Sequence, residues 1–153
     1  MTSIYTKNRK IFFDTGAFIA LAFKRDQYHE LAQSILKSIG NNCFQVTTNL
    51  IVSETYTYLR YHVNHDTAMN TVKAIRKAEA SGYLEVVYSD ISFEVRAVEI
   101  LEKYRDQDIS YVDAVSFAVL EKKPELIDVF AFDGHFSYIA GKNIITRRSM
   151  QGT

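Results

Sequence analysis

The fold of this chain is decided by Ile11-Phe12-Phe13-Asp14-Thr15-Gly16, which lies close to the N-terminus. Three large apolar residues precede an acid, a hydroxyl and a glycine, a pattern typical of a buried strand that ends in a turn. A stretch of the same form, Val129-Phe130-Ala131-Phe132-Asp133-Gly134, occurs near the other end of the chain. Ligands of open parallel sheets bind beyond the carboxyl ends of the strands. The two stretches therefore predict an α/β fold that delivers two acids to the binding edge of its sheet.

Between these stretches, short apolar runs alternate with helical patterns, which indicates a parallel sheet flanked by helices. We expect strands at residues 11–13, 43–47, 84–87, 129–132 and 144–145. We expect helices at residues 17–23, 50–63, 92–104 and 110–121, one capped by Asp26 that ends near 39, and one capped by Asp66 or Thr67 that ends near 82. No repeat or linker-like segment interrupts this pattern. Residues 1–153 are therefore expected to form a single domain, of which residues 1–10 are loose.

The composition is that of an ordinary globular protein, with 47% hydrophobic and 24% charged residues. The chain has 18 basic and 18 acidic residues and a formal net charge of zero, whereas sequence-independent nucleic-acid binders are usually basic. This balance leaves open an enzyme that holds nucleic acid through metal ions. Cys43 is the only cysteine, which excludes an intrachain disulfide, gives no support for a zinc site and favours the cytoplasm.

One segment resembles a secretion signal. Basic residues precede the apolar run 11–23, and Ala20-Leu21-Ala22 resembles a small-residue cleavage site. Asp14 lies inside the run, however, and an acid is costly in the apolar part of a signal peptide. The run is also shorter than the roughly 20 apolar residues that span a bilayer. We therefore expect neither a signal peptide nor a membrane span.

Asp14 and Asp133 each follow a predicted strand, and each also has an ordinary structural interpretation. Asp is a favoured helix N-cap, so Asp14 taken alone fits a cap for the helix that follows it. Asp-Gly is a common turn pair, so Asp133 taken alone fits a turn. Acids are almost never fully buried without a partner or a metal ion, which keeps a functional interpretation open for both residues.

Glu54 and Asp113 are acids within apolar helical patterns. Glu54 falls in the apolar stripe of the predicted helix 50–63, and the alternative is an exposed acid paired with a basic neighbour. Asp113 begins a helix that is apolar nearly all round. The alternative for Asp113 is a capping box with Ser110, and the capping and functional roles are compatible with each other.

These acids carry more weight together than singly, because they come from four separate elements and have no obvious basic partner nearby in sequence. We refer to them as the four acids: Asp14, Glu54, Asp113 and Asp133. Clustered carboxylates repel one another and raise each other's pKa values. A hard divalent cation such as Mg²⁺ or Mn²⁺ removes that penalty and prefers oxygen ligands. Such a site favours phosphoryl chemistry, because the metal polarises a phosphate and generates hydroxide.

Four segments of the chain resemble a PIN-domain nuclease, in particular the VapC-type toxins of toxin–antitoxin pairs. They are 12–18 (FFDTGAF), 47–54 (TTNLIVSE), 108–114 (DISYVDA) and 132–136 (FDGHF). Their order and spacing fit over almost the whole chain, and four segments in order are far more specific than any one of them. The resemblance implies a three-layer PIN-like fold, with a parallel sheet flanked by helices and an acidic pocket at the carboxyl edge of the strands.

By this resemblance, the four acids ligate one or two Mg²⁺ or Mn²⁺ ions, and the chain is a metal-dependent endoribonuclease that hydrolyses RNA phosphodiester bonds. Thr15 and Ser110 would orient carboxylates or contact phosphate, and Asp108 is a further candidate because it precedes the same helix as Ser110. The resemblance also implies the role of toxin in a type II toxin–antitoxin pair. Its implied partners are an RNA substrate, a cognate antitoxin that covers the acidic pocket, and a second copy of the chain in a homodimer.

Three other functions remain open. A housekeeping nuclease of the same fold would act on structured DNA or precursor RNA, although this chain has no basic extension to grip a duplex. A non-catalytic domain would only bind a partner, and the presence of all four acids argues against it. A phosphatase would use Asp14 as its nucleophile. Phosphatases of the haloacid type carry a second Asp two residues later, where this chain has Gly16.

Overall fold

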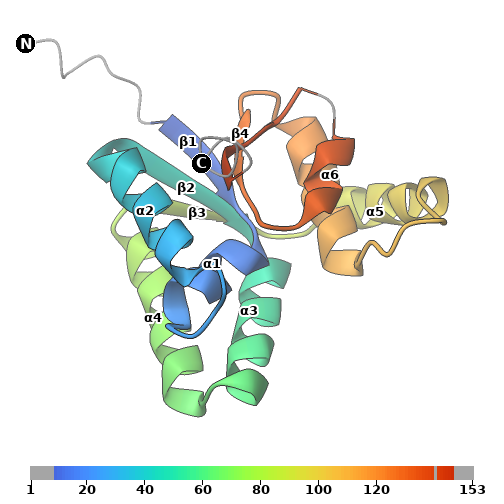
Figure 1. Cartoon of the computed structure of the whole chain (residues 1–153). Coiled ribbons are helices and arrows are strands. Elements are labelled where there is room, and N and C mark those ends of the chain that lie inside the picture. Colours follow the sequence, from blue (N-terminus) through green and yellow to red (C-terminus); the bar gives the residue numbers. More distant parts are fainter. Residues whose placement is uncertain (1–8, 140, 147–153) are drawn as a thin grey trace, which may run out of the picture.

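The computed structural model describes residues 9–139 and 141–146, and its centre is a five-stranded parallel sheet (Figure 1). The strands are β1 (Arg9–Phe13), β2 (Cys43–Thr48), β3 (Leu84–Val87), β4 (Asp128–Phe130) and β5 (Asn143–Ile144). Their order in the sheet is β3-β2-β1-β4-β5, and every pairing is parallel. The predicted α/β class with a central parallel sheet is confirmed.

Helices cover the sheet on both sides. They are α1 (Thr15–Ala22), α2 (His29–Ile39), α3 (Asn49–His62), α4 (His65–Ala80), α5 (Ile91–Lys103) and α6 (Tyr111–Lys122), with short 3-10 helices η2 (Gly40–Asn42) and η3 (Gly134–Tyr138). Figure 1 shows α5 and α6 together on one side of the sheet, and α1, α2 and α4 grouped on the other. This arrangement gives the three layers that the sequence predicts.

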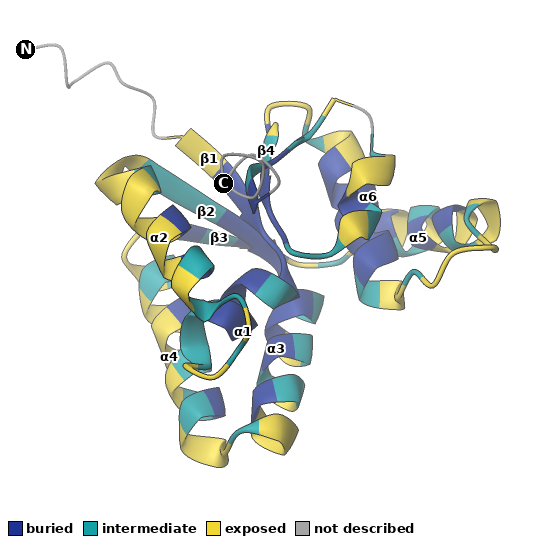
Figure 2. Ribbon diagram, in the orientation of Figure 1, coloured by how far each residue is buried: buried dark blue, intermediate teal, exposed yellow. Residues whose placement is uncertain are grey.

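The core lies along β1, β4 and α6, which Figure 2 shows largely in the colour of buried residues. Large apolar residues of the two strands pair, Phe12 with Val129 and Phe13 with Phe130, and the rings of Phe13 and Phe130 meet edge to face with centroids 5.0 Å apart. Residues 113–120 of α6 are all buried, as expected for a helix that is apolar nearly all round. Each fully buried phenylalanine side chain contributes roughly 1.5–3 kcal/mol to stability.

The sheet reverses its direction of growth between β1 and β4. The chain runs from β1 outward through β2 to β3, and then returns to place β4 and β5 on the other side of β1. Polar contacts fix the carboxyl ends of the two central strands: the Asp14 backbone N–H donates to Phe130 O at 3.0 Å, and the Thr47 hydroxyl donates to Phe13 O at 2.9 Å. Such a reversal is the usual ligand site of open α/β sheets.

The boundaries of four strands differ from those predicted, most of all in β1 and β4, whereas β3 has the predicted bounds. β1 begins at Arg9, whose backbone pairs with Cys43 of β2 and whose guanidinium donates to the Asp128 carboxylate of β4 at 2.7 Å. Arg9 and Lys10 are therefore part of the sheet and not of a loose terminus, whereas residues 1–8 lie outside the described residues. β4 ends at Phe130, two residues before the end of its apolar run.

Two helices begin at other caps than those predicted, and α5 begins one residue earlier than predicted. Asn64 caps α4 by accepting from the Thr67 backbone N–H at 2.7 Å, so neither Asp66 nor Thr67 is the cap. Asp90 caps α5 in the same way, one residue before the helix begins. Asp26 does not cap α2, because its carboxylate accepts from the Tyr28 backbone N–H and stabilises a turn before the helix.

The apolar run 11–23 is divided between β1 and α1, and both elements pack into the core. Among the described residues, none of the helices combines the length and the apolar character that crossing a bilayer requires.

Candidate metal centre

Asp14 lies at the end of β1 and is almost fully buried, with 4% of its surface exposed. It occupies the N-cap position of α1, but its side chain makes no capping hydrogen bond. Its Oδ1 atom is buried and has no hydrogen-bond partner. The capping interpretation therefore does not account for this carboxylate, whose Oδ1 atom is buried without a partner.

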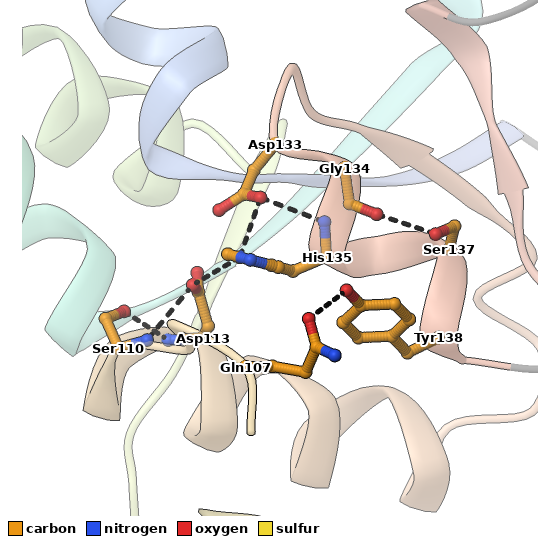
Figure 3. A network of polar contacts seen from close by, with 8 residues as sticks. All are labelled: Gln107, Ser110, Asp113, Asp133, Gly134, His135, Ser137 and Tyr138. Atoms are coloured by element: carbon orange, nitrogen blue, oxygen red, sulfur yellow. Dashed lines mark hydrogen bonds and ion pairs between the residues drawn. The ribbon is translucent and has the colours of Figure 1, made fainter. Parts of the chain in front are cut away.

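Asp133 follows β4 and begins η3. Its Oδ1 accepts a hydrogen bond from the His135 backbone N–H at 2.9 Å, which is the turn that the Asp-Gly pair predicts. The carboxylate is nevertheless not confined to the turn, because Figure 3 shows it facing Asp113 across the imidazole ring of His135. Asp133 therefore stabilises the turn and also contributes a carboxylate to the acid cluster.

Asp113 lies in the first turn of α6, where it forms the predicted capping box with Ser110. The Ser110 hydroxyl accepts from the Asp113 backbone N–H at 3.0 Å, and the Ser110 backbone N–H donates to Asp113 Oδ2 at 3.3 Å. This pair of bonds fixes the direction of a carboxylate that is only 7% exposed. The cap thus orients the acid as well as starting the helix.

Glu54 lies on α3 and is partly buried. The helix starts at the end of β2, where the Thr48 hydroxyl accepts from the Ile51 backbone N–H at 3.1 Å. Glu54 lines a cavity of about 500 Å³ between α3 and α6, together with Tyr58, His62 and Tyr111. Glu54 therefore borders an open space on the surface of α3 and α6.

The four acids act on one another electrostatically. Burial raises the pKa of Asp14 well above its usual range, and the charge of Asp113 is the next largest cause. Asp133 and Glu54 raise the Asp14 pKa further, while the backbone N–H of Thr15 opposes the rise. The structure therefore brings all four acids within electrostatic reach of one another, although they come from β1, α3, α6 and η3.

Asp113 has a raised pKa for the same reasons. Burial, followed by the charge of Asp133, raises the Asp113 pKa to about 6, and Glu54 adds to the rise. The hydrogen bonds from Ser110 oppose it. At neutral pH this carboxyl is mostly ionised, in a place where its charge is unfavourable.

The remaining predicted residues lie at different distances from this cluster. Thr15 is buried next to Asp14, and its hydroxyl has no hydrogen-bond partner. Ser110 contacts Asp113 directly, as described above. Asp108 is exposed on the loop before α6 and makes no hydrogen bond or ion pair in the described part of the chain, so the structure does not join it to the four acids.

His135 is a member of the cluster that the sequence did not reveal. We expect a histidine in an Asp-Gly-His turn to be exposed, yet its Nδ1 atom is buried and lies 2.9 Å from Asp133 Oδ1 and 3.8 Å from Asp113 Oδ2 (Figure 3). The only sequence signal is the spacing of two residues from Asp133. Whether that spacing turns the ring toward the acid or toward solvent depends on the 3-10 geometry of η3.

The donors of this cluster fit a divalent metal ion. Possible ligand atoms of Asp113, Asp133 and His135 all lie within 4.8 Å of one another. Asp14 adds a buried carboxylate oxygen without a partner, which a cation would satisfy. Carboxylate oxygens are the ligands that Mg²⁺ and Mn²⁺ prefer. A cation would also remove the repulsion that raises the pKa values of Asp14 and Asp113.

Comparisons with known proteins agree with this geometry. The 23S rRNA-specific endonuclease VapC20 of Mycobacterium tuberculosis is 34% identical over 127 residues, which cover 83% of this chain and 92% of that protein. A VapC ribonuclease of Archaeoglobus fulgidus is 26% identical over 127 residues, covering 81% of this chain and 77% of that protein.

A solved structure has the same fold. The crystal structure of M. tuberculosis VapC20, described as a Sarcin-Ricin loop cleaving toxin, matches with a TM-score of 0.77 and 31% identity. The match covers 88% of this chain and 98% of the VapC20 chain. The profile of the PIN domain matches residues 11–142, a range that includes all four acids. The chain therefore belongs to the PIN-domain family.

Proposed function

We propose that the four acids hold a divalent metal ion, Mg²⁺ or Mn²⁺, with which this chain hydrolyses phosphodiester bonds of RNA. The chain is an endoribonuclease of the VapC toxin type, as its family and its relatives indicate. The buried Oδ1 atom of Asp14, which has no hydrogen-bond partner, is the observation that supports the metal site most strongly. A purely structural acid at that position would have a capping hydrogen bond or a basic partner.

The charges of the site explain why a metal is needed. Carboxylates clustered at one sheet edge repel a phosphodiester, so the site cannot receive RNA without a compensating cation. A bound divalent ion supplies that compensation and makes water more acidic near the phosphate. The protein fixes the carboxylates in advance, through the capping box at Asp113 and the strand ends before Asp14 and Asp133.

The cavity between α3 and α6 supplies room for a substrate next to this cluster. Its wall includes Glu54 and Val112, the neighbour of Asp113, so it adjoins the acids. Tyr58 and His62 stack on each other in its wall with ring centroids 4.1 Å apart, and Tyr111 contributes a partly exposed ring. Aromatic faces of this kind stack on unpaired bases, which supports single-stranded or looped RNA as the substrate class.

The test is cleavage of RNA by the purified chain and by Asp14→Asn, each with Mg²⁺, with Mn²⁺ and with a chelator. We expect metal-dependent cleavage by the wild type and a loss of at least about 100-fold in the variant, because a neutral amide is a poor ligand for these ions. Asn fits the N-cap position as well as Asp does, so the helix should not suffer. The substrates should include ribosomal RNA and an isolated sarcin–ricin loop, because a relative carries that description.

Asp66→Asn is the matched control, because Asp66 is an exposed acid in the first turn of α4. It should cleave like the wild type. Equal activity of Asp14→Asn and Asp66→Asn would overturn the metal site. Cleavage of structured DNA but not RNA would favour the housekeeping alternative. Absence of both cleavage and metal binding in the wild type would leave a domain that only binds a partner.

The biological setting is part of the same proposal. We place the chain in the cytoplasm, paired with a cognate antitoxin, and propose that it forms a homodimer. The toxin type of its relatives supports the antitoxin, and the single, free Cys43 supports a reducing compartment. An exposed apolar stripe along α5 supports the homodimer, and it consists of Ile91, Val95 and Val98.

A further inference from the structure

The side chain of His135 is held against the acid cluster by its surroundings. Its ring packs at a tilt against Tyr138, with centroids 5.8 Å apart, and Tyr138 stacks on Tyr104. The Tyr138 hydroxyl donates to Gln107 Oε1 at 2.7 Å, and the Ser137 hydroxyl donates to Gly134 O (Figure 3). The loop of η3 and the end of α5 thus fix the ring in one orientation.

The Nδ1 atom of His135 faces two carboxylates but forms no hydrogen bond of normal geometry. It lies 2.9 Å from Asp133 Oδ1 and 3.8 Å from Asp113 Oδ2, and it has no hydrogen-bond partner although it is buried. Asp133 Oδ1 already accepts the His135 backbone N–H at 2.9 Å. A buried ring nitrogen without a partner requires an explanation, because a buried polar atom that makes no hydrogen bond destabilises the fold.

The separations match those of atoms that bind one ion. Adjacent ligands of a six-coordinate ion with bonds of about 2.1 Å lie about 3.0 Å apart, and opposite ligands lie about 4.2 Å apart. The distances from Nδ1 to the two carboxylate oxygens, 2.9 and 3.8 Å, fall at and between these values. The arrangement therefore suits a shared cation better than a hydrogen bond to either acid.

We propose that His135 ligates the metal ion through Nδ1 and makes the site prefer Mn²⁺ to Mg²⁺. This inference rests on the proposed metal site and extends it by one ligand. Imidazole nitrogen binds Mn²⁺ and other transition metals, whereas Mg²⁺ strongly prefers oxygen ligands. Ligation through Nδ1 places the ring proton on Nε2.

Direct proton transfer to RNA from Nδ1 is excluded by its position. The atom is inaccessible to solvent and points at the acids, so a leaving oxygen of a substrate cannot reach it. A purely structural ion pair with Asp133 is disfavoured by the missing hydrogen bond. Ligation uses the nitrogen in the orientation that the structure gives it.

The test measures the binding of Mn²⁺ to the full chain by EPR titration. Pulsed EPR of the bound Mn²⁺ then detects whether a nitrogen atom ligates it. We expect nitrogen modulation in the wild type and its loss in His135→Asn. We also expect His135→Asn to weaken Mn²⁺ binding about tenfold or more and Mg²⁺ binding, measured by competition, by clearly less. His65→Asn is the matched control, because His65 is an exposed histidine at the start of α4, and it should keep the nitrogen signal.

The outcomes separate this inference from the proposed function. Tight Mn²⁺ binding without nitrogen modulation in the wild type would overturn His135 as a ligand and leave the acid site intact. No binding of either ion would overturn both. An equal loss of Mn²⁺ and Mg²⁺ affinity in His135→Asn would reject the preference for Mn²⁺. Thermal unfolding of each variant, and His135→Ala as a second substitution, distinguish loss of a ligand from loss of the fold.

Discussion

Asp14 occupies the N-cap position of a helix without making the hydrogen bond of a cap. It stands at the N-cap of α1, yet its carboxylate is buried without a capping bond and has a pKa raised by burial and by Asp113. Asp113 has its own pKa raised to about 6. A carboxyl with a raised pKa retains its proton in the folded protein at pH values where the unfolded chain has released it.

The metal-free protein should therefore lose stability as the pH rises. The contribution of Asp113 is fully present below the ordinary Asp pKa of about 3.9 and is lost as the pH rises through about 6, which amounts to something on the order of 3 kcal/mol. Asp14 adds a loss in the same direction. Urea unfolding in the presence of a chelator, at pH values from about 4.5 to about 8, measures how the free energy of unfolding changes with pH.

Asp14→Asn should flatten that slope, because Asn does not titrate and its neutral side chain no longer raises the pKa of its neighbours. The metal-free variant should be more stable than the metal-free wild type near neutral pH, and saturating Mn²⁺ should narrow the difference by stabilising only the wild type. Asp66→Asn should follow the wild-type curve. If the free energy of unfolding depended on pH with the same slope in Asp14→Asn and in the wild type, the Asp14 carboxylate would not destabilise the metal-free fold.

At the residue scale, the sequence predicted the acids better than the histidine. Asp14 and Asp113 interrupt apolar runs, and that contrast is visible in the sequence alone. His135 lies in a polar turn, where nothing contrasts with it. Its ring packs against Tyr138 of η3, and Tyr138 in turn stacks on Tyr104 at the end of α5. Contacts between such distant segments leave no local pattern.

At the scale of elements, the start of α6 couples helix formation to the site. Ser110 and Asp113 exchange two hydrogen bonds, so the residue that caps the helix also orients a proposed ligand. Free helix ends cost stability unless such groups satisfy them. The same bonds lower the pKa of Asp113 against the effect of burial.

Ser110→Ala should destabilise the chain by about 1 kcal/mol, the usual value of a lost N-cap. It should also weaken Mn²⁺ binding, because Asp113 loses a contact that fixes its direction. Thermal unfolding and EPR titration measure the two effects. Ser110→Thr keeps a hydroxyl cap and should show neither effect in full, whereas unchanged stability of Ser110→Ala would contradict the structural role of the box.

The interiors of the elements were predictable, whereas the first residues of α4 and α5 were not. Periodic apolar residues mark the faces of α4 and α5 clearly. Several residues that can cap a helix precede each of them, however, and local preference does not separate Asn64 from Asp66 or Asp90 from Ser92. Which residue becomes the cap depends on where the preceding strand or helix ends, and tertiary packing determines that position.

At the scale of the whole molecule, the stripe of Ile91, Val95 and Val98 is the clearest exposed apolar feature of α5. Large contiguous apolar surfaces on soluble proteins commonly mark contacts. The expected homodimer should have about twice the 17.6 kDa of one chain. Light scattering after size exclusion, at two protein concentrations, measures this mass. A constant mass of one chain at both concentrations would contradict the homodimer.

The position of β1 between β2 and β4 also bears on how the protein is made. Synthesis delivers β1, β2 and β3 first, and these strands can pair as soon as they have emerged. The edge of β1 that pairs with β4 stays open until β4 arrives, and Asp133 follows after Ala131 and Phe132. Until β4 and Asp133 have been synthesised, a nascent chain therefore lacks both the partner of one edge of β1 and one of its four acids.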